Sequence, residues 1–256
     1  MTQTIALAGK GGVGKTTITG MLIQYLIAKK KGAVLAVDAD ANANLNEVLG
    51  VEVGATLGDI REEMAHAEMN PAQVIPLGMT KQDYAEMKFG DALIESDDFD
   101  LLVMGRTQGK GCYCFVNGIL TTQVQRYANN YRYVVVDNEA GMEHISRGIL
   151  PKIDTILLVS DASRRGVQAC GRIFELTKEL KLGAKETKLL VNRAPGGVLS
   201  DGVREEIEHF GMDLLGVLPQ DEGIYQADGD GEPSSRLPAD NAFRLALYAA
   251  LDKMDL

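Results

Sequence analysis

The chain has 256 residues, is 45% apolar and 24% charged, and carries a net charge of −10 at pH 7 with a pI near 4.9, which is the composition of an ordinary globular protein. The acidic total disfavours sequence-independent binding to nucleic acid or anionic membranes, which needs a basic surface, and the sequence shows neither a secretory signal peptide nor a membrane-spanning run of about 18 apolar residues. Three cysteines are too few for a disulfide framework, so we expect a cytoplasmic protein with reduced thiols and with no nucleic acid or membrane as partner.

Short apolar, β-branched runs alternate with helical patterns along the chain. Helices are expected at residues 16–31, 116–129, 141–150, 163–181, 199–209 and 239–254. Strands are expected at residues 3–9, 33–40, 99–105, 132–139, 154–160, 186–192 and 213–219. These strands are continuously apolar, as strands covered by helices on both faces are. The pattern predicts an α/β fold in which residues 1–256 form a single domain with one doubly wound, mostly parallel sheet flanked by helices. Residues from about 52 to 98 are expected to be a less regular insertion.

A glycine-rich sequence, GKGGVGKTT, follows the first expected strand and precedes the first expected helix. It matches the pattern G-x-x-x-x-G-K-[ST] of a phosphate-binding loop (P-loop), in which glycines let backbone N–H groups approach phosphate oxygens at a helix N-terminus. The lysine would place its charge on the β and γ phosphates, and the hydroxyl that follows it would bind Mg²⁺. The residues expected to contact the nucleotide here are Gly9, Gly11, Gly12, Val13, Gly14, Lys15, Thr16 and Thr17, with Thr16 as the Mg²⁺ ligand.

Polar side chains follow several of the expected strands. Asp38 and Asp40 end the second strand, and Asp137 follows the apolar residues 134–136 in the way that a Walker B aspartate does. Such positions face the crevice in which ligands bind in parallel sheets. Asn192 ends a later strand, and its carboxamide could both donate to and accept from adenine. The sequence N-R-A-P at this point replaces the N-K-x-D pattern of GTPases, which favours ATP.

A second lysine, Lys10, gives the loop the form K-G-G-x-G-K-[ST]. This form resembles the deviant Walker A class of ATPases, which includes septum-site and partition ATPases, the nitrogenase iron protein and metallocentre-assembly ATPases. The resemblance implies a homodimer in which Lys10 reaches the partner's nucleotide, as an arginine finger would. It also implies that Asp40 positions the attacking water, that Asp38 lies near Mg²⁺ through a water, and that Gly141 belongs to a second switch that senses the γ phosphate. The alternative for Lys10, Asp38 and Asp40 is a solvated side chain.

Two of the three cysteines, Cys112 and Cys114, lie one residue apart in GKGCYCFVNG. In an extended backbone both side chains point to one face, where two thiolates could bind one soft metal ion. A closed tetrahedral site usually has four protein ligands, and Cys170 lies far along the chain on an expected helix. A dimer could supply four thiolates if the two pairs faced each other across its two-fold axis, which would form a site for Zn²⁺ or Ni²⁺. The alternative is two small buried side chains.

The P-loop, the VDAD strand end, the CYC motif and the EAGMEHISRG segment together resemble the CooC-type ATPases. These assist maturation of nickel-containing carbon monoxide dehydrogenase and of acetyl-CoA synthase. The resemblance covers essentially the whole chain and implies an ATP-hydrolysing dimer that binds nickel or zinc at its interface and assists nickel insertion into one of these client enzymes. The client, the physiological metal, and whether ATP loads or releases the metal stay open.

Two other functions are compatible with the P-loop. A partition or septum-site ATPase would be a spatial organiser, but residues 241–256 carry no basic face for a membrane, and the acidic total disfavours DNA. An iron protein-like, ATP-dependent iron–sulfur reductase would bridge its cluster with cysteines that are well separated in the chain. Cys112 and Cys114 are instead separated by a single residue.

Overall fold

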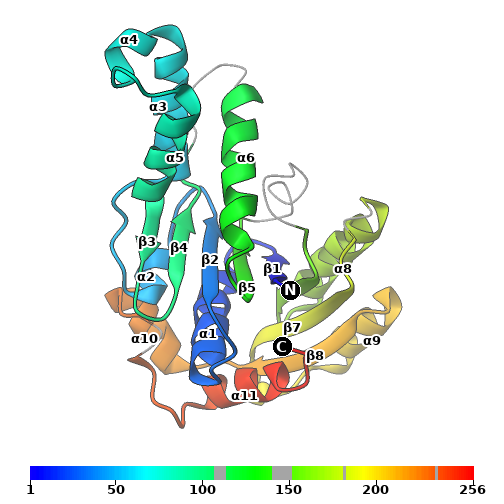
Figure 1. Ribbon diagram of the computed structural model, residues 1–256. Helices are drawn as coiled ribbons and strands as arrows, with labels where there is room; N and C mark the ends of the chain where they lie inside the picture. The colour runs from blue at the N-terminus through cyan, green and yellow to red at the C-terminus, as the bar shows by residue number, and fades with distance from the viewer. Residues whose placement is uncertain (107–113, 140–151, 181–182, 234–235) are drawn as a thin grey trace.

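The computed structural model describes residues 1–106, 114–139, 152–180, 183–233 and 236–256. Within them, eight strands form one sheet in the order β3-β4-β2-β5-β1-β6-β7-β8 (Figure 1). All neighbouring pairs are parallel except β3 and β4. The strands are β1 Gln3–Gly9, β2 Val34–Ala39, β3 Leu93–Glu95, β4 Asp100–Val103, β5 Tyr133–Asn138, β6 Thr155–Asp161, β7 Glu186–Ala194 and β8 Asp213–Pro219. The expected α/β fold is therefore confirmed.

Helices cover both faces of the sheet. They are α1 Lys15–Ala28, α2 Leu45–Leu49, α3 Leu57–Met69, α4 Pro71–Val74, α5 Lys81–Ala92, α6 Cys114–Ala128, α8 Arg164–Glu179, α9 Asp201–Phe210, α10 Glu222–Asp230 and α11 Ala242–Leu251, with a 3₁₀ turn η1 at Pro195–Gly197. In the part of the chain that the structure describes, no helix is long and apolar enough to cross a membrane.

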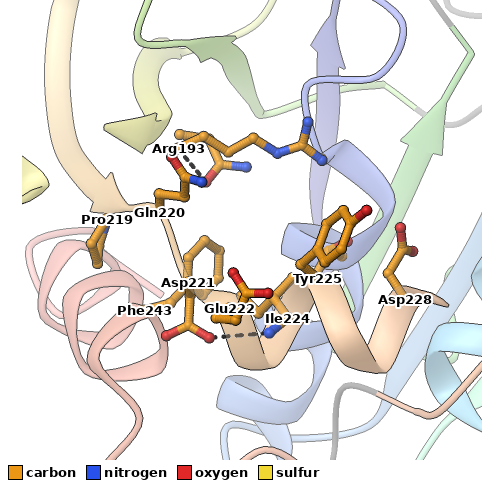
Figure 2. A pocket seen from close by; sticks show the side chains of 12 residues that line it. Arg193, Pro219, Gln220, Asp221, Glu222, Ile224, Tyr225, Asp228 and Phe243 are labelled. Carbon is orange, nitrogen blue, oxygen red and sulfur yellow. Dashed lines mark hydrogen bonds between the residues drawn. The ribbon is translucent and has the colours of Figure 1, made fainter. Parts of the chain in front are cut away.

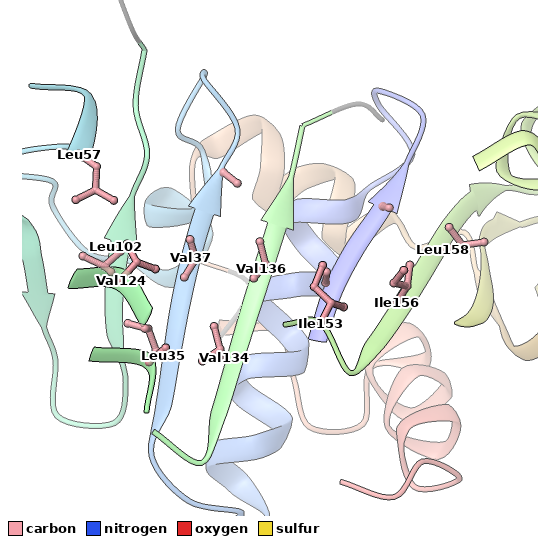
Figure 3. Close-up of a cluster of buried hydrophobic side chains, with 14 of the residues drawn as sticks. Leu35, Val37, Leu57, Leu102, Val124, Val134, Val136, Ile153, Ile156 and Leu158 are labelled. Atoms are coloured by element: carbon pink, nitrogen blue, oxygen red, sulfur yellow. The ribbon is translucent and has the colours of Figure 1, made fainter. Parts of the chain in front are cut away.

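Alternate side chains of each strand enter two separate buried clusters. Ile5 and Leu7 of β1 pack with α1, α2 and α11 on one face, whereas Ala6 and Ala8 pack with α3, α5, α6, α8 and α9 on the other. Figure 3 shows part of the second cluster along β2 and β5. Burial on both faces explains why these strands are apolar without alternation.

The seven strands expected from sequence coincide with β1, β2, β4, β5, β6, β7 and β8, to within one or two residues at each end. The expected helices correspond to α1, α6, α8, α9 and α11, and all of these except α6 are shorter than expected. The expected helix at 141–150 lies outside the described residues.

Residues 52–98, expected to be a less regular insertion, contain α3, α4, α5 and β3. Both longer helices begin with a capping box, Thr56 with Asp59 and Thr80 with Asp83. In each, the threonine hydroxyl oxygen accepts the N–H of the aspartate, and the aspartate carboxylate accepts the N–H of the threonine. α3, α5 and α6 pack together and extend beyond the sheet, with α4 at the far end (Figure 1). The region is therefore more regular than its sequence pattern indicated.

Gly58, in the first turn of α3, joins this helical group to the segment that follows β4. Its N–H donates to the carbonyl oxygen of Met104 at 2.8 Å. A Cβ on Gly58 would lie 2.5 Å from the backbone oxygen of Arg106 and 3.2 Å from that of Met104. The chain after β4 and the start of α3 approach so closely that glycine alone fits between them.

We expect Gly58→Ala to lower the free energy of unfolding by about 1–3 kcal/mol, because the added methyl group forces backbone atoms apart. The matched control is Gly90→Ala in α5, where a Cβ would meet no atom within 4 Å and alanine should stabilise the helix by about 0.5–1 kcal/mol. Urea denaturation of both variants measures the difference. Equal shifts in the two midpoints would show that the close approach at Gly58 does not exist.

Candidate functional site

The P-loop connects β1 to α1 at the edge of the sheet where the parallel strands end. Gly14 is the N-cap of α1 with φ +92°, and a Cβ there would lie 2.5 Å from Nδ2 of Asn192. No side chain caps α1. The first N–H groups of the helix therefore have no intrahelical acceptor, which is the arrangement that binds phosphate.

The two lysines of the loop differ in exposure. Lys15 is 7% exposed, and its Nζ donates to the carbonyl oxygens of Gly9 at 3.4 Å and Lys10 at 3.2 Å. These bonds hold its charge against the backbone of the loop. The side chain of Lys10 is exposed. The structure thus separates a lysine fixed at its own loop from one that is free to reach outward.

Asp137 is a buried carboxylate beside the start of α1. It is 1% exposed, it lies opposite Asp38 in the register of β5 and β2, and Thr19 Oγ1 donates to its Oδ1 at 3.2 Å. Burial raises the pKa of Asp137 to about 7, and the neighbouring Asp38 carboxyl raises it further. Three interactions lower this pKa: a hydrogen bond from Thr16, the charge of Lys15 and the hydrogen bond from Thr19. A cation would relieve this unfavourable burial, so Thr16 and Asp137 fit the expected Mg²⁺ position.

Asp38 holds the loop that follows β2. It is fully buried, and its carboxylate accepts the N–H groups of Asp40 at 3.0 Å and Leu45 at 2.9 Å. Burial raises the pKa of Asp38, although these backbone bonds lower it. Asp40 is half-buried, and its Oδ1 accepts the N–H of Asn42 at 2.8 Å. The contacts of Asp38 therefore shape the loop that presents Asp40, and the expected roles of both carboxylates toward Mg²⁺ and water stay predictions.

Asn192 and Arg193 lock the end of β7 onto the P-loop. Asn192 is 4% exposed; its Nδ2 donates to the carbonyl of Val13 at 2.8 Å, and its Oδ1 accepts the N–H of Arg193 at 2.8 Å. Arg193 adopts φ +56° and donates through its guanidinium to the carbonyl of Gly12 at 2.9 Å. The carboxamide expected to meet adenine is therefore bound to protein atoms here, at the wall of a cavity.

That cavity has a volume of about 420 Å³ and lies beside the P-loop (Figure 2). Its lining is Gly14, Thr17, Asn192, Arg193, Pro219, Gln220, Asp221, Glu222, Ile224, Tyr225, Asp228 and Phe243. A mixed polar and aromatic cavity next to a P-loop is suited to a nucleotide base. The residues after β8 were not expected to contribute. The available signal was the P-Q-D sequence, because polar residues directly follow a strand at the ligand-binding edge.

A pair of capping side chains fixes the cavity walls. Asp221 Oδ1 accepts the N–H of Ile224 at 3.0 Å, which caps α10 (Figure 2). Asp221 Oδ2 accepts from Nδ2 of Asn241 at 2.9 Å, and Asn241 in turn accepts the N–H of Arg244 at 2.9 Å and caps α11. The two helix N-termini are thus held together, and α10 and α11 cannot separate without breaking these bonds.

The remaining expected site residues are placed as follows. Cys112 and Gly141 lie outside the described residues, and Cys114 is the first residue of α6. Cys170 is fully buried, and burial raises the pKa of its thiol to about 12, which agrees with its exclusion from the metal site. Among the residues that the structure describes, no group of three or more histidine, cysteine, aspartate or glutamate side chains could hold a metal ion.

Comparison with known proteins agrees with this geometry. Residues 4–234 match the CobQ/CobB/MinD/ParA nucleotide-binding domain. The chain is 43% identical to an uncharacterized ATP-binding protein of Methanocaldococcus jannaschii (93% of this chain, 92% of that one) and 31% identical to the carbon monoxide dehydrogenase accessory protein CooC of Rhodospirillum rubrum (96% and 95%). Its fold is similar to that of the septum site-determining protein MinD with Mg-ADP from Pyrococcus horikoshii, with a TM-score of 0.71, 21% identity, and coverage of 100% of this chain and 96% of that one.

We expect the nucleotide-free protein to lose stability as the pH rises from about 4 to about 7. Asp137 has a raised pKa, so the folded state binds more protons than the unfolded state in this range, and its contribution is greatest below the unfolded pKa. Asp137→Asn should remove that loss. It should make the protein more stable than the parent at pH 8, by at most about 4 kcal/mol at 1.4 kcal/mol per pKa unit.

Urea denaturation at pH 5 and pH 8 measures this effect, with the exposed loop residue Asp98 as the control, in Asp98→Asn. The same variants are compared with Mg²⁺ and ATP present, where the parent should be stabilised and Asp137→Asn should not. An Asp137→Asn protein that is less stable than the parent at pH 8 would contradict the assigned burial cost.

Proposed function

We propose that this chain, which belongs to the CobQ/CobB/MinD/ParA family of ATP-binding and ATP-hydrolysing P-loop proteins, is a metallochaperone. Its homodimer would bind a nickel or zinc ion and assist nickel insertion into carbon monoxide dehydrogenase or acetyl-CoA synthase. The observation that carries the proposal is the Cys112–Cys114 pair. It occurs in a chain that resembles a carbon monoxide dehydrogenase accessory protein along nearly its full length.

The nucleotide part of the proposal rests on the loop and its surroundings. The uncapped N-terminus of α1 and Lys15 would bind the phosphates, and the cavity beside Arg193 would take the base. Mg²⁺ held by Thr16 and facing Asp137 would neutralise phosphate charge. Asp40, fixed in its loop by Asp38, would orient the attacking water.

The metal part rests on where the cysteines occur in the fold. The segment that contains Cys112 runs from β4 to Cys114 at the start of α6, and β4 neighbours β2, which leads to Asp40. Residues 104–106, which precede the cysteine segment, and the P-loop therefore leave the same edge of the sheet. A dimer that joins two such edges would bring two cysteine pairs together, and the exposed Lys10 would reach the partner's nucleotide.

The spatial-organiser and iron–sulfur alternatives make different demands on the chain. Relatives named as septum site-determining proteins share the ATPase fold, but a spatial organiser has no use for a local cysteine pair. An iron–sulfur reductase would hold a coloured cluster. Metal analysis of the purified dimer separates these functions: bound nickel or zinc supports our proposal, whereas a brown chromophore or no metal favours one of the others.

We expect Lys10 to act in trans. Lys10→Ala and Lys15→Ala should each be nearly inactive in ATP hydrolysis, but a mixture should regain activity, because one site of a mixed dimer has an intact P-loop and receives Lys10 from the other chain. Steady-state ATPase assays of the separate and mixed proteins measure this. If mixed dimers form and their rate does not exceed the sum of the separate rates, Lys10 does not act across the dimer.

We expect Ni²⁺ or Zn²⁺ to dimerise the protein without nucleotide, at about one ion per two chains, since two thiolates per chain supply half of a four-ligand site. The Cys112→Ala/Cys114→Ala variant should lose tight metal binding and metal-driven dimerisation, yet still dimerise with ATP. Cys170→Ala is the matched control and should behave like the parent. Metal affinity should fall as the pH drops below about 7, because the ligands must be thiolates.

Metal content together with molecular mass by light scattering measures both effects. One ion per chain, or equal binding by the double cysteine variant, would overturn the shared site.

A further inference from the structure

Residues 104–106, directly after β4, are fixed between two elements. The N–H of Met104 donates to the carbonyl oxygen of Asp38 at 2.8 Å, and the carbonyl of Met104 accepts the N–H of Gly58 at 2.8 Å. Gly105 has φ +66°, and a Cβ there would lie 2.4 Å from Oγ1 of Thr56. The backbone is therefore held on one side by the end of β2 and on the other by the start of α3.

From this fixed backbone, the side chain of Arg106 reaches the loop that carries Asp40. Its guanidinium donates to Oδ1 of Asn42 at 2.9 Å. The N–H of Asn42 donates to Oδ1 of Asp40 at 2.8 Å. Two hydrogen bonds thus link Arg106 to the carboxylate proposed to orient the attacking water, one to the side chain of Asn42 and one from its backbone N–H.

The bond between Arg106 and Asn42 is exposed, and exposed hydrogen bonds contribute little to folding free energy. Its consequence is geometric. Asp38 binds the backbone of the loop at Asp40 and Leu45, and Arg106 binds the side chain of Asn42 between these points. Arg106 therefore restrains the part of the loop that Asp38 does not hold, which includes the residue that donates to the Asp40 carboxylate.

We infer that Arg106 is a positioning residue for ATP hydrolysis, acting through Asn42 on Asp40. This role rests on the proposed water-orienting role of Asp40, and it does not depend on the cysteine pair or on a metal ion.

The positioning role is tested by steady-state ATPase kinetics. Arg106→Ala and Asn42→Ala should each lower kcat roughly three- to tenfold while KM for ATP stays within about twofold of the parent, because ground-state binding is retained. The double variant should be no slower than the slower single variant, since both remove one interaction. Arg106→Lys should recover part of the rate, because an ammonium can still donate to Asn42.

Arg126→Ala is the matched control, since Arg126 is an exposed arginine of α6 that pairs with Glu86 at 3.3 Å, away from the loop. It should keep the parent kcat. Urea midpoints confirm that each variant is folded. A parent-like kcat in both single variants, or effects that multiply in the double variant, would overturn the positioning role.

Asp40→Asn is measured in the same assay and should lower kcat at least roughly tenfold. A parent-like kcat in Asp40→Asn would overturn the proposed role of Asp40. A slow Asp40→Asn protein beside parent-like Arg106 and Asn42 variants would overturn the positioning role alone.

Discussion

Two buried carboxylates, Asp38 and Asp137, lie opposite each other on neighbouring strands. The structure of the sheet edge that carries the P-loop depends on how their charges are stabilised. Two carboxylates in such a position cannot both be ionised without compensating donors or cations. Asp38 accepts backbone N–H groups of the loop that follows it, so its charge organises protein structure. Asp137 is compensated only in part by hydroxyl groups and Lys15, and burial leaves its pKa near the physiological range, at about 7. The same strand pairing therefore produces one structural carboxylate and one that favours a cation.

This division explains why the loop that carries Asp40 connects to distant parts of the fold. Asp38 binds the loop through its side chain, and its backbone carbonyl also binds Met104 after β4. Met104 contacts Gly58 of α3, so the end of β2, the segment before the cysteines and the helical group of α3, α5 and α6 share one set of contacts. Residues 104–106 are therefore linked directly to the loop that carries Asp40, although the two segments are far apart in sequence.

Short sequence patterns predicted most of the strands and the phosphate-binding loop. The continuous apolar strands, the P-loop and the carboxylates at strand ends are each readable within about ten residues. The helices α3 and α5 were missed because their clearest signals are two short T-x-x-D capping boxes, at Thr56 and Thr80, in a region of weak amphipathic periodicity. The cavity beside the P-loop is lined by residues that are distant in sequence, and the Asp221–Asn241 and Arg106–Asn42 bonds join such residues. Only the folded topology reveals these pairs.

We propose that two chains share one metal ion through four cysteine sulfurs, next to two nucleotide sites. X-ray absorption at the zinc edge of the zinc-loaded dimer tests it most directly, because a thiolate site has Zn–S distances of about 2.3 Å. We predict about four sulfur neighbours per zinc at this distance and none in the Cys112→Ala/Cys114→Ala variant. A first shell of about two sulfurs completed by nitrogen or oxygen would mean that each chain binds its own ion, which would contradict the shared site.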